Sequence, residues 1–108
     1  MTLNDYQLGA LKTRNRDLSQ NEVLTNAVMG MCGEAGECID AVKKHLHQGH
    51  KLDEVHLAEE LGDVMWYCAE LAYALGYDLD EIAEMNLRKL DKRYHGEFEP
   101  CKSINRVE

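Results

Sequence analysis

Apolar residues recur along this chain at intervals of three and four, the spacing that places side chains on one face of an α-helix. This pattern predicts helices over about residues 3–16, 19–48, 53–76 and 78–94. No segment shows the alternation of apolar and polar residues that is typical of a β-strand. The sequence therefore predicts an all-α fold, a helical bundle of about four helices per chain.

The boundaries of the predicted helices follow from capping residues. Ser19-Gln-Asn-Glu22 and Asp78-Leu-Asp-Glu81 both have capping-box spacing, and Gly49 is expected to stop the second helix. Residues 99–108 show no clear period and are expected to form an ordered or partly ordered tail. No linker separates the helices, so residues 1–108 are predicted to form one domain with a core over about residues 19–98.

The second and third predicted helices each carry a long apolar stripe. On the second it consists of Leu24, Val28, Met31, Ala35, Cys38, Val42 and Leu46, and on the third of Leu57, Leu61, Val64, Met65, Cys68, Leu71, Ala72 and Leu75. Because only a short polar turn joins the two helices, they are expected to pack antiparallel through these stripes.

A second apolar seam, on nearly the opposite side of the third helix, contains Val55, Gly62, Trp66, Ala69 and Tyr73. A helix that is apolar on two sides is expected to be buried on two sides. We expect a second copy of the chain to cover this seam, in a homodimer or homotetramer. Coverage by the first and fourth helices of the same chain is the alternative.

Composition limits the classes of function. The 108 residues are 44% hydrophobic and 30% charged, with a net charge of −8. This negative charge argues against a nucleic-acid polymer as partner, because phosphate contacts need clustered Lys and Arg. The sequence lacks an apolar run long enough to cross a bilayer and shows no signal-peptide pattern, so a cytoplasmic protein without a membrane partner is expected.

Four carboxylates occupy matching positions beside the two apolar stripes. Glu34 and Glu60 lie about 80° from the centre of their stripes, and Glu37 and Asp63 lie about 140° from it, at 100° per residue. Antiparallel packing would bring these acids to one groove, beside Gly33, Gly36 and Gly62. Four such acids repel one another unless they are protonated or bind cations, and oxygen ligands favour Mg²⁺, with Mn²⁺ as the alternative. Ordinary solvent-exposed glutamates are the competing interpretation.

The four acids also form a recognisable motif. Glu34-x-x-Glu37, then 22 residues, then Glu60-x-x-Asp63 resembles the signature of MazG-like nucleotide pyrophosphohydrolases, an all-α family of NTP pyrophosphatases. The segments GEAGECIDAVKKHLHQGH, EELGDVMWYCAELAYALGYDLDEIAEMN and NLRKLDKRYHGEF are similar to family segments in order and spacing. The ending KSINR resembles short phage- or prophage-type members.

The resemblance implies hydrolysis of a nucleoside triphosphate or deoxynucleoside triphosphate to the monophosphate and pyrophosphate, in a nucleotide-pool housecleaning role. Glu34, Glu37, Glu60 and Asp63 would be the catalytic and metal-binding residues, and one of them could instead act as general base. The candidate substrate-binding residues are Asn86, Lys89, Arg93, Tyr94, Lys43, Ser103 and Arg106.

Two alternatives remain at this point. One is a catalytically silent helical module that binds a nucleotide or a protein. The other is a related all-α dUTPase or dCTPase, which differs only in its recognition of the base. The sequence leaves open the preferred base and sugar, the number of metal ions and the phosphorus that is attacked.

Overall fold

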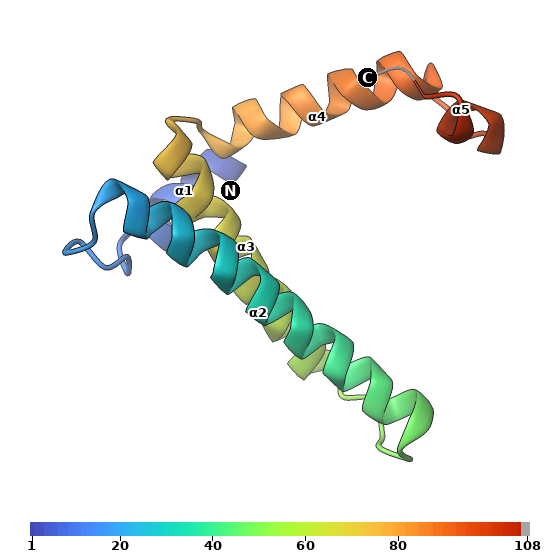
Figure 1. The fold of residues 1–108 in the computed structure, drawn as a ribbon, viewed down its shortest axis with the longest axis horizontal. Helices are drawn as coiled ribbons and strands as arrows, with labels where there is room; N and C mark the ends of the chain where they lie inside the picture. The colour runs from blue at the N-terminus through green and yellow to red at the C-terminus, as the bar shows by residue number, and fades with distance from the viewer. Residues whose placement is uncertain (107–108) are drawn as a thin grey trace.

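A computed structural model describes residues 1–106, and it confirms the predicted all-α fold (Figure 1). Two long helices lie side by side as a hairpin, a short N-terminal helix packs on one of them, and a fourth helix extends away from the hairpin. The helices are α1 Leu3–Leu11, α2 Gln20–His47, α3 Glu54–Leu75, α4 Leu79–Tyr94 and α5 Pro100–Ile104. None of them is both long enough and apolar enough to cross a membrane.

The helix termini agree with the predicted capping signals. Ser19 and Glu22 form a capping box at the start of α2, and Asp78 begins α4 in the same way. Asp53 caps α3 by accepting a hydrogen bond from the backbone N–H of His56, and Gly76 ends α3 with a φ of 80°. This left-handed conformation costs glycine little, which explains why the helix stops there.

The first helix is shorter than predicted, because it ends at Leu11 and not near residue 16. The hydroxyl of Thr13 donates to the carbonyl of Ala10 at 2.9 Å, and the Arg14 guanidinium donates to the carbonyl of Leu11 at 2.9 Å. Such side-chain bonds satisfy the last helical carbonyls and compete with continuation of the helix.

The α2–α3 hairpin is packed through small side chains. Ala27 and Ala69 have no exposed surface, Ala72 is 3% exposed, and the ring of Tyr67 lies directly against the backbone of Gly30. Helices with small residues at their contact approach closely, since few side-chain atoms separate their backbones. The close approach fixes which residues face each other across the hairpin.

The predicted apolar stripes are not centred on this contact. Val28, Val42 and Leu46 of α2 are 49%, 37% and 65% exposed, and Leu61 of α3 is 58% exposed. Apart from Ala72, the small residues at the contact lie beside the stripes, and they permit a closer approach than the large ones do, so the helices are rotated relative to the prediction. Much of each stripe is therefore left on the surface of the single chain.

Near Trp66, the seam of α3 is covered in part by the N-terminal segment of the same chain, as the alternative expected, and coverage by a second copy stays a prediction. The Trp66 indole N–H donates to the Ala10 carbonyl and to the Thr13 hydroxyl of the same chain, both at 2.9 Å. Gln7, only 5% exposed, donates to the carbonyls of Ala69 and Tyr77 and accepts from the backbone N–H of Leu79. Helix α1 and the residues just after it therefore pack against this part of the α3 seam.

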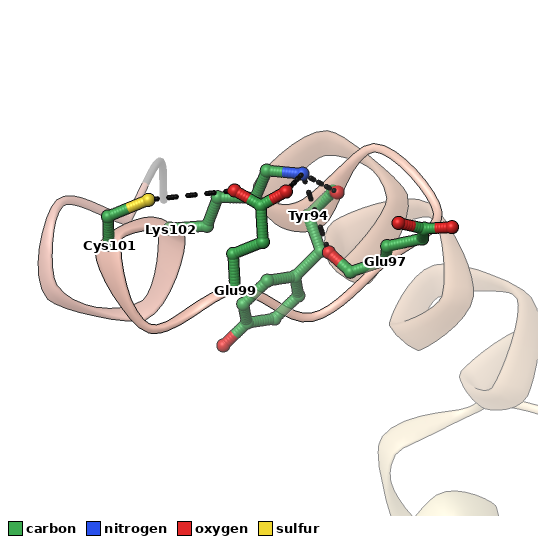
Figure 2. Close-up of polar contacts among 5 residues, drawn as sticks. All are labelled: Tyr94, Glu97, Glu99, Cys101 and Lys102. Carbon is green, nitrogen blue, oxygen red and sulfur yellow. Dashed lines mark hydrogen bonds and ion pairs between the residues drawn. The ribbon is translucent and has the colours of Figure 1, made fainter.

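The C-terminal residues form a compact turn at the far end of α4, where the sequence predicts no helix (Figure 2). Lys102 of α5 donates from Nζ to the Tyr94 carbonyl at 2.8 Å and lies 3.7 Å from a Glu99 carboxylate oxygen. Pro100 occupies the first turn of α5, a position where its fixed φ suits a helix. The short helix is held by these local contacts with the end of α4.

Gly30 and Gly33 provide a matched test of the hairpin packing. A Cβ on Gly30 would overlap the Tyr67 ring, whereas a Cβ on Gly33 meets no atom within 4 Å. Gly30→Ala is therefore expected to lower the free energy of unfolding by about 1–3 kcal/mol through overpacking. Gly33→Ala is expected to raise it by up to about 1 kcal/mol, through helix propensity. Urea unfolding measures both, and equal effects would contradict the close contact.

Candidate metal centre

Three of the four predicted acids come together on one edge of the hairpin. Glu34 of α2, with Glu60 and Asp63 of α3, can place one carboxylate oxygen each within 4.8 Å of one another. Glu60 and Asp63 are three residues apart on α3, so they share a helix face. The Gly30–Tyr67 contact one turn away sets the register that brings Glu34 to this face.

The electrostatics of the cluster are those of crowded acids. A hydrogen bond with the carboxyl group of Glu60 raises the pKa of Glu34, and partial burial and the charges of Asp63 and Glu60 raise it further. A hydrogen bond between two carboxyl groups requires a shared proton, since two carboxylates repel each other. A bound cation would replace that proton.

The donor set fits a hard divalent cation. Mg²⁺ binds oxygen ligands at about 2.0–2.1 Å, so ligands on opposite sides of the ion are roughly 4.2 Å apart. The oxygens of Glu34, Glu60 and Asp63 lie within 4.8 Å of one another, so one ion could contact all three. Carboxylate ligands without nearby Cys are typical of Mg²⁺ or Mn²⁺ sites.

Glu37, the fourth predicted ligand, lies outside this group. It is exposed and lines a neighbouring cavity of about 240 Å³ together with Asp40, Lys44 and His56. His56 connects the cavity to the cluster, because its Nε2 lies 3.4 Å from a carboxylate oxygen of Glu60. Glu37 therefore lies beside the cluster, and its metal-binding role stays a prediction.

Aromatic side chains adjoin the other side of the cluster. Trp66 and Tyr67 line a cavity of about 260 Å³ whose remaining walls are Glu34 and Asp63. The two rings meet edge to face, with centroids 5.0 Å apart and planes at 84°. Burial raises the pKa of Tyr6 on α1, and the nearby Cys68 and Asp63 raise it further. A ligand held by the acids would thus lie next to a rigid aromatic wall.

The residues predicted on α4 are not brought to this centre within one chain. Asn86, Lys89 and Arg93 lie along α4, which extends away from the hairpin (Figure 1). Within residues 1–106, α4 contacts α1, α5 and the end of α3, and it does not contact α2. Arg93 lies over the ring of Tyr94 at 6.0 Å, and its Nε is buried without a hydrogen-bond partner among the described residues.

The remaining substrate-binding candidates are also separate from the acids. Lys43 lies 3.6 Å from Asp40, on the exposed side of α2. Its neighbour Lys44 makes the shorter 2.8 Å ion pair with Asp40, which lowers the pKa of Asp40 and raises that of Lys44. Ser103 lies in α5 and Arg106 follows it, at the far end of α4. Their roles in binding stay predictions.

Several neighbours of the cluster were absent from the sequence-based candidates. His56 precedes Glu60 by one helical turn, a spacing that predicts proximity. Tyr67 follows Asp63 by one turn in the same way. Tyr6 carries no such signal, because only the packing of α1 on α3 brings it close to Asp63.

Together, the helical hairpin and its carboxylate cluster define an all-α protein with a candidate centre for a divalent cation. Comparison with known families agrees with this description: the model of the MazG nucleotide pyrophosphohydrolase domain matches residues 22–98. The chain belongs to the MazG nucleotide pyrophosphohydrolase family. Enzymes of this family hydrolyse nucleoside triphosphates and are generally dependent on divalent metals.

A relative from a phage supports the assignment. The chain is 38% identical over 101 residues to the "Gene 37 protein" of Mycobacterium phage L5, an alignment that covers 86% of this chain and 89% of the relative. This similarity is consistent with the predicted short phage-type member. No solved structure matches the chain significantly.

The crowding of acids predicts a dependence on pH. Since folding raises the pKa of Glu34, the folded state binds this proton more tightly, and the resulting stabilisation is lost as pH rises through the raised value. In metal-free protein, wild type is therefore expected to lose stability relative to Glu34→Gln as pH rises from about 4 to about 7. The melting temperature of Glu34→Gln minus that of wild type should increase over this range.

Adding Mg²⁺ at the higher pH should stabilise wild type and have a much smaller effect on Glu34→Gln. Glu59→Gln, which changes an exposed glutamate next to the cluster, is the control and should respond to Mg²⁺ like wild type. Thermal melts with and without Mg²⁺ measure both effects. An equal response to Mg²⁺ in all three proteins would contradict a metal site at Glu34.

Proposed function

We propose that the protein is a metal-dependent pyrophosphohydrolase that converts a nucleoside or deoxynucleoside triphosphate to the monophosphate and pyrophosphate. The observation that carries the proposal is the cluster of Glu34, Glu60 and Asp63 at the motif positions of a MazG domain. A housecleaning role, removing unwanted nucleotides from the pool, follows from this reaction.

In the proposed reaction, the three clustered carboxylates would hold one or more Mg²⁺ or Mn²⁺ ions. When bound, such an ion would neutralise phosphate charge and lower the pKa of the attacking water. The water oxygen forms a bond to phosphorus, the bridging P–O bond breaks, and the electron pair leaves with the departing phosphate group. Glu37, exposed beside the cluster, would serve as a further ligand or as the base that takes a proton from water.

The reaction also needs cations from the protein, because the triphosphate and the acid cluster are both negative. Lys89 and Arg93 are suited to this role by charge but lie on α4, away from the acids of their own chain. The same helix exposes apolar side chains, with Met85 45% and Leu87 65% exposed. We therefore propose a homodimer or homotetramer in which α4 of one copy completes the site of another.

Activity is tested with Mg²⁺ and a panel of standard and modified nucleoside triphosphates. Pyrophosphate release is expected from at least one of them, and Glu60→Gln should lower kcat by at least about 100-fold through loss of a metal ligand. Glu59→Gln is the matched control and should retain activity, because this residue is exposed and is not among the clustered acids. Folded wild-type protein that releases no pyrophosphate from any nucleotide would overturn the proposal.

Completion of the site by a second copy is tested by mixing two inactive variants. Glu60→Gln lacks an acid and Lys89→Ala lacks a cation, so a mixed dimer contains one site in which both are intact. After subunit exchange, an equal mixture is expected to recover about a quarter of wild-type activity, since half of the dimers are mixed. Two copies of the same variant give the background rate. A mixture that remains at background would show that Lys89 does not act in trans.

The alternatives make different predictions in the same assays. A silent nucleotide-binding or protein-binding module would retain its ligand in Glu60→Gln while releasing no pyrophosphate in any variant. A dUTPase or dCTPase would hydrolyse one pyrimidine nucleotide strongly and the rest of the panel weakly.

A further inference from the structure

Contacts continue along the edge of the hairpin beyond the metal centre. Three pairs cross from α2 to α3 at intervals of about one helical turn: Glu34 with Asp63, Gly30 with Tyr67, and Asn26 with Glu70. Residues 26, 30 and 34 follow one side of α2, since positions four apart share a face. The acids, the aromatic ring and the polar pair therefore form one continuous edge.

The length of this edge suits a nucleotide. Glu34 and Asn26 are eight residues apart, which corresponds to roughly 12 Å along the helix axis at 1.5 Å per residue. A triphosphate held at the acids would extend its sugar past Tyr67, and its base would reach the surroundings of Asn26.

A cavity lies at the Asn26 end of the edge. It has a volume of about 620 Å³ and is lined by Leu18, Asn21, Glu22, Thr25, Asn26, Met29 and Gly30. The hollow opens widely to solvent, and all of its lining residues lie on α2 or directly before it, so it would contact a base from one side. Apolar surface from Leu18 and Met29 combined with amide and hydroxyl groups matches a nucleobase, which has apolar faces and a polar edge.

The hydrogen-bonded pair of Asn26 and Glu70 at this cavity is unusual, because its carboxyl group is buried. Glu70 is only 2% exposed, although a buried carboxyl group is costly without a hydrogen-bond partner. Asn26 supplies that partner, because its Nδ2 donates to the Glu70 carboxylate at 2.8 Å. The side chain of Asn26 is otherwise exposed and lines the cavity. The buried acid thus holds a surface amide in place.

The hydrogen bond also determines which way the amide faces. A rotation of the Asn26 amide by 180° would set Oδ1 against a Glu70 oxygen, where two acceptors repel each other. Asn26 therefore keeps its donor toward Glu70 and offers Oδ1 and a second amide proton to a ligand. An amide that cannot rotate distinguishes base edges in which the order of hydrogen-bond donor and acceptor is reversed. An amide that rotates freely can bind either kind of edge.

We propose that Asn26, oriented by Glu70, is the residue that selects the nucleobase, by accepting a hydrogen bond from an N–H group on the edge of the base. This inference rests on the proposed nucleotide pyrophosphohydrolase activity and assigns its specificity to the cavity at the start of α2. Glu70 is a positioning residue, because it acts on the base through Asn26.

The experiment compares kcat/KM for pyrophosphate release from dATP, dGTP, dCTP and dTTP, and from dUTP, with Mg²⁺ present. Wild type is expected to prefer one base. Asn26→Ala should reduce the ratio between the preferred and the poorest nucleotide by at least about tenfold. Gln48→Ala is the control, because Gln48 is exposed at the other end of α2 and does not line this cavity, and it should keep the wild-type ratio.

Glu70→Gln serves as the second variant, because a Gln amide can either donate or accept and so releases Asn26 to rotate. It should keep the fold, as judged by circular dichroism, and raise the relative kcat/KM of the poorer nucleotides. If Asn26→Ala does not fold, this variant alone tests the inference. An unchanged base ratio in Glu70→Gln and in folded Asn26→Ala would overturn it, as would a wild type without base preference.

Failure of the proposed activity is recognised separately. If wild type cleaves no triphosphate, binding of the five deoxynucleoside monophosphates is measured by calorimetry. A base preference that Asn26→Ala removes would support the assigned cavity even then, and equal binding by both proteins would overturn it. If wild type cleaves selectively and Asn26→Ala keeps the same base ratio, the proposed activity stands and the proposed role of Asn26 in base selection is overturned.

Discussion

The close approach of α2 and α3 is the constraint on which the rest of the structure depends. Ala27, Gly30 and Ala69 leave so little between the two backbones that the ring of Tyr67 lies on Gly30. One fixed contact sets the register of two antiparallel helices, and the register determines which residues face each other elsewhere along them. This contact therefore also determines that Glu34 meets Glu60 and Asp63. The candidate metal centre is thus a consequence of how small side chains pack one turn away.

That packing has two energetic consequences. Hydrogen bonding with Glu60 and the nearby charges raise the pKa of Glu34, so the metal-free cluster favours a proton or a cation at this position. The use of small residues also leaves little buried apolar surface, and large side chains such as Val28, Leu46 and Leu61 stay exposed in the single chain. Both features support the proposal that a cation and a second copy stabilise the molecule.

The features that follow local rules could be predicted from the sequence. Capping residues Ser19, Asp53 and Asp78 set the starts of three helices, and Gly76 set an end, because caps act through neighbouring backbone groups. The E-x-x-E and E-x-x-D spacings likewise indicated a carboxylate cluster. The rotation of the helices was not predictable in this way. The periodicity of apolar residues shows where a stripe lies, but it does not show whether packing through its large side chains is more favourable than a closer contact between small residues.

The sequence by itself determined the all-α class, most helix boundaries, the family and the acids that define its motif. Tertiary structure decided which of those acids meet: Glu34, Glu60 and Asp63 gather, while Glu37 lies in the adjoining cavity. It also decided that α1 covers Trp66, that Asn26 meets Glu70, and that α4 points away from the acids. These contacts join residues up to 56 positions apart. They depend on packing between helices, which no local pattern encodes.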